Sequence, residues 1–423
     1  MPEILTTPDP EQREFGHLWP ELLPNGRAVL FAIDTGGGFD NALIAVQSLE
    51  TGERKILLEG GTAPHYAPTG HLVYAREEKL LAVPFNLEEL AVTGQPLPVL
   101  ENVWVNSFRG LAQFSFSKDG LLAYIPAHHP EAKRRLVWVN RKGGVEPLPA
   151  PERAYWLPRL SPNGQRVAVV ITGPTSDIWT YDIQSNRLTQ LTSEIGLVDA
   201  PVWTPDGNRV AFSARREGRF NLYWQAADGS ASEENLWVRQ YWHSPFSWSP
   251  DGKVLIFGEH YPPTGWDILV LRLGDKPEPF LRSPFHEGGA VFSPSGHWIA
   301  YISLESGASR VYVQPFPRSG KKWQVSTEGG TEPVWSRDGR ELFYRKGNMM
   351  MVIPIQTSPS FNAGKPRLLF EGRFQAGYPG QPNYDVASDG RRFLMVESEW
   401  EPTVTKLNVV LNFFEELKQR MGN

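Results

Sequence analysis

Short apolar segments alternate with polar turns along the whole chain, and this pattern returns nine times. Each repeat has an apolar or aromatic stretch, a turn related to Ser/Thr-Pro-Asp/Asn-Gly, and a second apolar stretch. Most turn glycines are 43 to 45 residues apart, and two gaps are 50 and 51. A fixed period of this size indicates a repeat architecture. The nine turn glycines are Gly26, Gly70, Gly120, Gly164, Gly207, Gly252, Gly296, Gly339 and Gly390.

One repeat shows which elements the pattern predicts. Residues 200–204 form an apolar run suited to a buried strand, and Pro205-Asp206-Gly207 is a turn in which Pro presets φ and Gly takes a positive φ. Residues 209–213 alternate as a second strand, and residues 221–224 form a third. A hairpin signal at 227–229 precedes a weaker fourth strand. Four antiparallel strands per repeat are typical of a propeller blade.

The sequence therefore predicts an all-β fold: a single large β-propeller of about nine four-stranded blades over residues 1–423. Eight blades plus one degenerate unit is the alternative count. The N-terminal residues 2–7 resemble an outer strand without a blade of their own, so we expect them to complete the last blade and close the ring. Residues 408–421 are expected to form a short helix packed on the ring, or a docking helix for a partner, with Leu411, Phe414 and Leu417 as its apolar stripe.

Composition excludes several classes of protein. The net charge of −5 and the absence of a basic run argue against nucleic-acid binding. The chain has no cysteine, which excludes disulfides and thiolate metal sites. No stretch is apolar for long enough to span a membrane, and residues 1–17 lack the features of a signal peptide. As written, the sequence predicts a soluble chain in the cytoplasm.

The turn phrase followed by an apolar strand resembles PD40-type, WD40-like repeats. These repeats occur in TolB-like propellers, in the non-catalytic domains of tricorn-type proteases and in prolyl oligopeptidases. Over nearly the whole chain, segments such as PVWTPDGNRVAFS and WQVSTEGGTEPVWSRDGRELFYR also resemble the C-terminal propeller of bacterial eukaryotic-like Ser/Thr protein kinases. The resemblance implies a sensory or binding propeller.

The chain departs from that kinase family because it carries no kinase motifs. The Gly-rich loop of kinases and the Val-Ala-Ile-Lys, His-Arg-Asp and Asp-Phe-Gly elements are absent. The start of the chain resembles an outer strand of an upstream blade, so a fragment of a longer protein and a short stand-alone member both stay open. A membrane-anchored kinase as parent would imply an extracytoplasmic location instead of the cytoplasm.

Residues just before each inner strand are expected to line one mouth of the central channel. Counting back nine positions from each turn glycine gives a register that holds His17, His243 and Glu287, with His286 and Asp199 beside it. Imidazole and carboxylate groups bind Zn²⁺, Mn²⁺ or Ca²⁺. This pattern makes His17, His243, His286 and Glu287 candidate metal ligands, and it makes His243, Glu287 and Asp199 candidate catalytic residues.

The same loops carry candidates for binding a ligand, because aromatic and charged side chains precede several inner strands. Protein, peptide and small-molecule ligands at the loop face or pore are all compatible with these side chains. The candidates are Arg109, Tyr155, Trp156, Tyr241, Trp242 and Glu332.

Two functions stay open at this stage. The leading hypothesis is a ligand- or protein-binding propeller without kinase activity and with no certain cofactor, because the chain has no Gly-x-Ser-x-Gly elbow and no second His after His286-Glu287. The alternative is a metal-dependent hydrolase of esters, lactones or phosphotriesters, in which a divalent ion at the channel mouth activates water.

Overall fold

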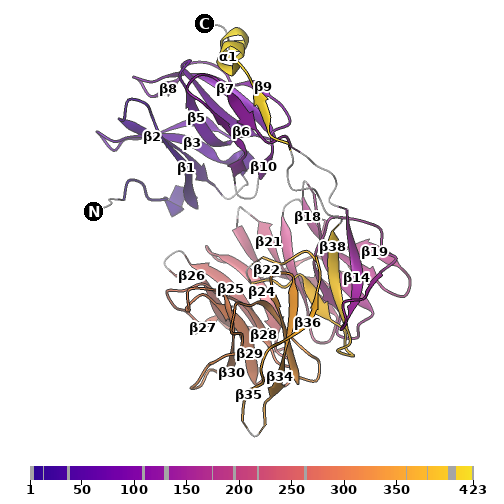
Figure 1. Cartoon of the computed structure of the whole chain (residues 1–423). Coiled ribbons are helices and arrows are strands. Elements are labelled where there is room, and N and C mark those ends of the chain that lie inside the picture. Colours follow the sequence, from indigo (N-terminus) through magenta and orange to yellow (C-terminus); the bar gives the residue numbers. More distant parts are fainter. Residues whose placement is uncertain are drawn as a thin grey trace. The chain divides into compact units, whose positions relative to one another are not determined.

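The computed structural model divides the chain into two compact units (Figure 1). Unit 1 comprises residues 1–130 and 402–423, and unit 2 comprises residues 131–401. The structure describes residues 4–12, 14–35, 39–106, 110–127, 133–173, 175–193, 197–216, 219–261, 264–358, 360–378, 380–398 and 406–421. Strands dominate both units, so the all-β prediction is confirmed.

Unit 2 is a closed ring of six sheets, which we call the ring. Four sheets are each built from consecutive strands: β16 (Tyr155–Leu160), β17 (Arg166–Thr172), β18 (Ser176–Asp182) and β19 (Arg187–Gln190); β20 (Val198–Trp203), β21 (Arg209–Arg216), β22 (Arg219–Ala226) and β23 (Glu234–Trp237); β24 (Trp242–Trp248), β25 (Val254–Tyr261), β26 (Gly265–Arg272) and β27 (Glu278–Leu281); β28 (Glu287–Phe292), β29 (Trp298–Ser303), β30 (Arg310–Pro315) and β31 (Trp323–Gln324). The fifth sheet is β32 (Thr331–Trp335), β33 (Glu341–Lys346), β34 (Met349–Gln356), β35 (Asn362–Ala363) and β36 (Arg367–Glu371).

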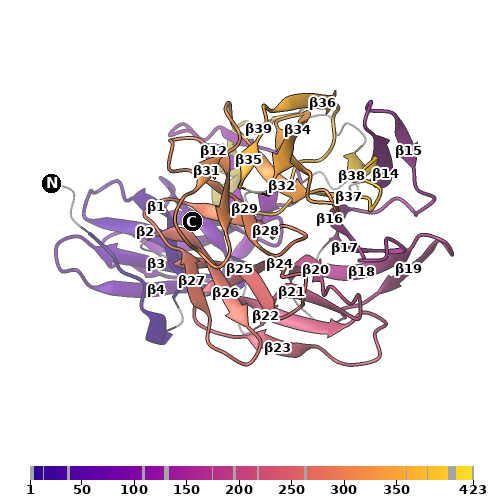
Figure 2. The same ribbon diagram turned by 90° about the horizontal axis from the view of Figure 1, so that it is seen from below.

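The sixth sheet joins the two ends of unit 2. It is formed by β14 (Arg134–Asn140) and β15 (Val145–Pro147) from the start of the unit, and by β37 (Tyr384–Val386) and β38 (Arg392–Ser398) from its end. Strands β14 and β38 pair antiparallel from Arg134↔Ser398 to Asn140↔Arg392. The inner strands β16, β20, β24, β28, β32 and β37 each contact the next one, and β37 contacts β16 (Figure 2). The ring is therefore closed.

This closure corrects two details of the sequence prediction. The last blade is completed by β14 and β15, not by residues 2–7, because β38 meets the free edge of β14. The carbonyl of Leu5 instead accepts a hydrogen bond from Gln47 in unit 1. The repeats are also divided between two units, and the ring holds six blades, so they do not form one large ring. A propeller with a short C-terminal helix is nevertheless what the structure shows.

The turn motif has a direct structural explanation at its Ser/Thr and Asp positions. The hydroxyl of Thr204 donates to Asp206 at 2.6 Å and accepts from the N–H of Arg209 at 3.0 Å. Ser249 repeats both bonds, with Asp251 at 2.6 Å and Val254 at 3.0 Å. Each turn is thus closed by side chains that replace missing backbone partners.

The Pro and Gly of the motif pack between neighbouring turns. A Cβ built on Gly296 would lie 3.3 Å from the ring of Pro250 in the preceding turn, and one on Gly207 would lie 3.5 Å from Pro162. Where the preceding turn has no Pro, as before Gly164 and Gly390, nothing lies within 4 Å. Each of these glycines also has a positive φ. The repeated Pro-x-Gly therefore serves contact between blades as well as the turn itself.

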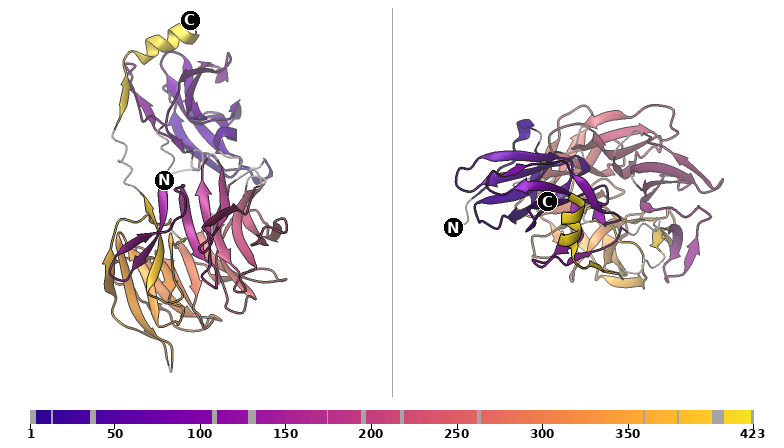
Figure 3. Two further views of the ribbon diagram at one scale, coloured as in Figure 1. Left: turned by 90° about the vertical axis from the view of Figure 1, so that its right-hand side faces the viewer. Right: turned by 90° about the horizontal axis from the view of Figure 1, so that it is seen from above.

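Unit 1 is an array of sheets completed by the C-terminal residues (Figure 3). Its first two sheets are β1 (Gly16–Leu22), β2 (Ala28–Asp34), β3 (Leu43–Ser48) and β4 (Arg54–Glu59); and β5 (Thr62–Ala67), β6 (His71–Arg76), β7 (Lys79–Asn86), β8 (Ala91–Val92) and β9 (Leu97–Leu100). A hairpin of β10 (Val105–Asn106) and β11 (Leu111–Ala112) precedes a sheet of β12 (Phe114–Phe116), β13 (Leu122–Tyr124) and β39 (Asn408–Val410). The ring is thus inserted in sequence between β13 and β39.

The C-terminal helix is shorter than predicted. Residues 408–410 extend as β39 beside β13, and helix α1 covers Phe413–Met421. Asn412 has a φ of 59°, which separates the strand from the helix. The predicted stripe is correct at Phe414 and Leu417, which are buried in the core of unit 1, but Leu411 is exposed.

Candidate binding site at the centre of the ring

Most inner strands of the ring share a backbone irregularity near their start. The pairing of β16 with β17 shifts between Trp156 and Arg159, and Leu157 within that shift has a φ of 51°. Ala200 and Glu332 occupy the same place in β20 and β32, with φ values of 53° and 58°. A bulge of this kind leaves backbone groups outside the ladder, and these groups need other partners.

Two such groups, the N–H of Leu157 and the carbonyl of Pro245, bond to one irregular stretch of chain, Gln375–Asn383, which we call the central segment. It lies between β36 and β37 and has no regular secondary structure in its described residues. Its side chains and backbone bond to residues of β16, β20, β24 and β32. On β28, a Cβ built on Gly288 would lie 3.3 Å from the Cα of Gly380. The central segment therefore meets all five other inner strands.

Tyr378 is the aromatic anchor of the central segment. Its hydroxyl donates a hydrogen bond of 2.6 Å to Asp199 Oδ2 on β20. Its ring stacks on Trp156 of β16, with centroids 6.5 Å apart and planes 14° from parallel. The guanidinium of Arg134 lies 5.2 Å from the centroid of the same Trp156 ring. Three layers of side chain thus hold the hydroxyl on the carboxylate.

Gln381 is the polar anchor. Its Nε2 donates to Ser244 Oγ at 2.9 Å and to the carbonyl of Pro245 at 2.8 Å, both on β24. Its Oε1 accepts from Arg159 Nη2 on β16 at 3.3 Å. The backbone N–H of Gln381 also donates to the Tyr378 carbonyl at 3.0 Å, which closes a turn between the two anchors. The carboxamide is buried and fully paired.

Glu332 clamps the backbone of the central segment at two points. Its Oε1 accepts from the N–H of Gly377 at 3.2 Å, and its Oε2 accepts from the N–H of Asn383 at 2.8 Å. Asn383 in turn accepts from the N–H of Leu157 at 2.6 Å. Arg345 of β33, which is itself buried, donates to the carbonyl of Gln375 at 2.9 Å. These are the contacts that a binding site makes with a polypeptide backbone.

Gly377 is required for this path. A Cβ at residue 377 would lie 1.9 Å from the carbonyl oxygen of Gln381, far inside contact distance. Gly380 has a φ of +95°, a conformation in which other residues are strained. The central segment can therefore fold back on itself only with glycine at position 377.

Burial raises the pKa of each carboxyl group around the central segment. Desolvation raises the pKa of Asp199 and of Glu332, and Arg159 opposes the shift in both. Desolvation also lowers the pKa of Arg159, against the charge of Asp385. Arg345 opposes the shift at Glu332 more strongly than Arg159 does. The centre of the ring thus holds Arg159 and Arg345 near three carboxyl groups in a poorly solvated setting, where charged hydrogen bonds are strong.

The structure brings together three of the residues that the sequence proposed. Trp156, Asp199 and Glu332 all hold the central segment. Tyr155 is buried, and its hydroxyl donates to the Pro151 carbonyl at 2.5 Å, while burial raises its pKa to about 12, so it is a structural residue.

Two further aromatic candidates lie in other contacts. Tyr241 packs edge-on against Tyr261 at 5.1 Å, and Trp242 packs on His260 at 6.3 Å. Arg109 lies outside the described residues.

Two of the candidate metal ligands are engaged in hydrogen bonds of their own. His17 belongs to unit 1, where Thr6 and Glu14 bond to its ring nitrogens at 2.8 and 3.1 Å. His243 is fully buried, with Asn221 at 2.9 Å on Nδ1 and Glu259 at 3.1 Å on Nε2. Among the residues that the structure describes, no group of three or more His, Asp or Glu side chains is placed to hold a metal ion.

Two candidates remain beside each other at the start of β28. Glu287 accepts a hydrogen bond from Ser283, and burial raises the pKa of Glu287 to about 7. Burial lowers the pKa of His286, and the nearby His260 adds to this effect. No contact among the described residues favours the hydrolase hypothesis over a structural role for this pair.

Sequence reasoning missed most of the central segment. Gln381 lies nine positions before Gly390 and so falls in the channel register, but no pattern in the sequence marks Tyr378, Gly377 or Asn383. One signal was present: the gap of 51 residues between Gly339 and Gly390 is the longest of the eight, and the central segment lies within it. A gap longer than the period indicates an insertion, but it does not show where the insertion folds.

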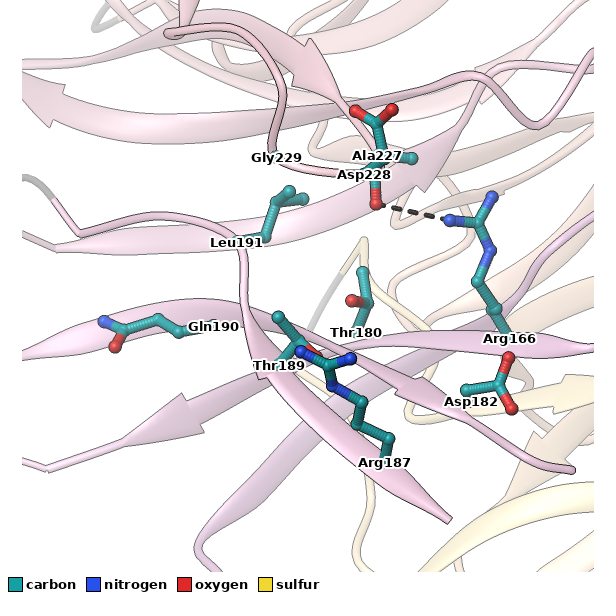
Figure 4. Close-up of a pocket in the computed structure, with 10 residues that line it drawn as sticks. All are labelled: Arg166, Thr180, Asp182, Arg187, Thr189, Gln190, Leu191, Ala227, Asp228 and Gly229. Carbon is teal, nitrogen blue, oxygen red and sulfur yellow. Dashed lines mark hydrogen bonds between the residues drawn. The ribbon is translucent and has the colours of Figure 1, made fainter. Parts of the chain in front are cut away.

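A shallow pocket lies elsewhere on the ring, between outer strands (Figure 4). Its volume is about 240 Å³, and β18, β19 and the turn at 227–229 line it. Arg166 crosses it to bond the Ala227 carbonyl at 3.3 Å. Two Arg and two Asp side chains balance its charge, and it contains none of the residues that the sequence proposed.

Comparison with known proteins supports the fold. Residues 115–262 match the family model described as the TolB beta propeller domain, PD40. The solved structure of a protein assigned as TolB from Agrobacterium tumefaciens aligns with 63% of this chain and 98% of its own, with a TM-score of 0.54 and 17% identity. The chain carries a TolB-like β-propeller. The predicted resemblance to PD40-type, TolB-like propellers is thereby confirmed, whereas the resemblance to kinase-linked propellers stays a prediction.

Two curated relatives match slightly less than half of this chain. Uncharacterized protein Atu1656 of Agrobacterium fabrum is 25% identical over 210 residues, which are 48% of this chain and 68% of that protein. Uncharacterized peptidase YuxL of Bacillus subtilis is 31% identical over 205 residues, which are 44% of this chain but only 28% of that protein. No helix among the described residues is long and apolar enough to cross a membrane.

Proposed function

We propose that the TolB-like ring is a polypeptide-binding module whose site is the centre of the ring, where the inner strands begin. The central segment carries this proposal, since irregular polypeptide lies there against side chains from around the ring. Asp199, Ser244 and Glu332 supply acceptors, and Trp156 supplies a stacking surface. Such a set recognises backbone N–H groups, a hydroxyl and an amide, which are the groups of a peptide.

We propose the class of ligand, a polypeptide, and no particular partner protein. A peptide held by buried charge-assisted hydrogen bonds is expected to bind with specificity for its polar groups, because a partner lacking one group leaves a buried acceptor unpaired. Turnover is not part of the proposal, since every polar side chain named at this site is used in positioning the segment.

The test uses a peptide with the sequence of residues 374–384, FQAGYPGQPNY, added to the full chain carrying Gly377→Ala. That substitution is expected to expel the central segment, because its Cβ would collide with the Gln381 carbonyl. Calorimetric titration should show one peptide bound per chain, and binding should be lost when Glu332→Ala or Asp199→Ala is added.

A scrambled peptide of the same composition is the control. If the folded Gly377→Ala chain binds neither peptide, or binds both equally, the centre of the ring is not a polypeptide site and the proposal fails.

A further inference from the structure

The central segment belongs to the chain itself, so the site is already occupied. Resting on the proposed function, we infer that residues 375–383 are an intramolecular competitor of the partner, and that the partner offers an aromatic hydroxyl followed three residues later by a carboxamide. The segment thereby excludes weakly binding ligands from the centre of the ring. Three features of the segment support this inference: the spacing of its anchors, its attachment to the ring and the residues next to it.

The anchors define what the site recognises. Tyr378 and Gln381 are three residues apart, and the backbone bond between them fixes that spacing. The two side chains reach different blades: the hydroxyl bonds Asp199 of β20, and the carboxamide bonds Ser244 and Pro245 of β24. A ligand must reach Asp199 and the Ser244–Pro245 pair at the same time. A ligand with only an aromatic hydroxyl, or only a carboxamide, therefore makes only part of these hydrogen bonds.

The attachment of the segment makes it separable from the ring. The described part of the chain from residue 372 to residue 383 forms no strand or helix, whereas β36 before it and β37 after it are paired in their sheets. Leaving the site therefore breaks the contacts of the segment but no strand of the ring. The described residues of the segment are held by hydrogen bonds to side chains and not by a strand ladder, so the segment can open locally without unfolding a sheet.

The residues around Gly380 leave little space for a side chain at that position of the segment. The glycines of β28 leave only 3.3 to 3.5 Å between their would-be Cβ atoms and Gly380, so no side chain from β28 competes for the position of the segment. Phe246 closes the same corner, with its ring 3.4 Å from a Cβ built on Gly380. The site thus fits a glycine between the anchors, and we include a small residue at that position in the expected partner.

The first measurement compares the affinities of wild type, two variants and a control variant for the peptide FQAGYPGQPNY. Wild type should bind weakly, Tyr378→Phe about tenfold more tightly because its own segment has lost the bond to a buried carboxylate, and Gly377→Ala more tightly still. Gly229→Ala, at an exposed turn with nothing within 4 Å, is the matched control and should bind as wild type does.

The second measurement follows the central segment directly. Hydrogen exchange of residues 375–383 in wild type should rise when the peptide is present, since the N–H groups of Gly377 and Asn383 lose their bonds to Glu332. Peptides with Tyr→Phe or Gln→Ala at the anchors should bind the Gly377→Ala chain about tenfold more weakly.

The outcomes separate this inference from the proposed function. If wild type and Gly377→Ala bind the peptide equally, with no change in exchange at 375–383, the segment is not a competitor and this inference falls. The proposed function still stands in that case if Glu332→Ala or Asp199→Ala abolishes the binding. If both anchor-substituted peptides bind as well as the parent peptide, the anchor rule is wrong. Absence of binding to a folded Gly377→Ala chain overturns the proposed function itself.

Discussion

Glu287 is the residue at which burial and charge conflict most directly. Its side chain is 1% exposed, and its Oε2 has no hydrogen-bond partner among the described residues. Because burial raises its pKa to about 7, the folded state favours the protonated acid, whereas the unfolded chain ionises near the ordinary value of 4.5. Its contribution to stability is therefore fully present below about pH 4.5 and is lost as the pH rises to about 7.

Glu287→Gln should remove that loss. The amide keeps the shape of the acid without a charge, so the free energy of unfolding at pH 8 should increase by on the order of 3 kcal/mol, with little change at pH 4.5. Urea unfolding at the two pH values measures this difference. Glu146→Gln, on the exposed strand β15, is the control and should change neither value. An equal effect of Glu287→Gln at both pH values would contradict the pKa argument.

The turn glycines offer a second comparison at the scale of single residues. Gly164 and Gly296 have nearly equal φ values of 71° and 74°, but only Gly296 faces a neighbouring proline. Gly164→Ala should cost about 1 kcal/mol through backbone strain alone. Gly296→Ala should cost roughly 1 kcal/mol more, since Pro250 must also move. Equal losses in urea unfolding would show that the proline contact does not stabilise the ring.

Helix α1 is the element on which the core of unit 1 depends. Phe413, Phe414 and Leu417 are buried together with residues of β6, β7 and β9. Leu417→Ala should destabilise unit 1 by roughly 2 to 5 kcal/mol, the usual range for such a truncation in a core. Hydrogen exchange should then quicken in β7 but not in β17 of the ring. Glu416→Ala, on the exposed face of the helix, serves as the comparison and should leave both strands unchanged.

The elements were predictable where a local pattern determines them. The Ser/Thr-Pro-Asp-Gly turns encode their own hydrogen bonds. A Trp three residues before the turn Asp recurs in three blades and is buried in each, since Trp203, Trp248 and Trp335 are 6 or 7% exposed. The partner of β38 was not predictable, because a period of two residues assigns a face to a side chain but does not identify the neighbouring strand. For the same reason, the sequence marked Trp156, Asp199 and Glu332 but not the segment that they hold.

At the scale of the whole molecule, the closed ring should fold without unit 1. The strands that close it, β14 and β38, lie near the two ends of unit 2 and pair over seven residue pairs. A polypeptide of residues 133–398 should therefore unfold in one cooperative thermal transition. A shorter polypeptide, 148–398, lacks β14 and β15 and leaves the edge of β38 free, so it should melt lower and self-associate, as judged by light scattering. Identical behaviour of the two would contradict the closure.

The insertion of the ring between β13 and β39 has a consequence for the order of folding during synthesis. Tyr124 and Asn408 are hydrogen-bonded neighbours in unit 1, yet they are 284 positions apart in the chain. At ordinary translation rates the ribosome needs on the order of 15 to 60 s to add those residues. The ring can close during most of that interval, whereas the strands of unit 1 must wait with Leu122 and its apolar neighbours uncovered. Unit 1, although it is begun first, is finished last, and it is the part of a nascent chain that would most need a chaperone.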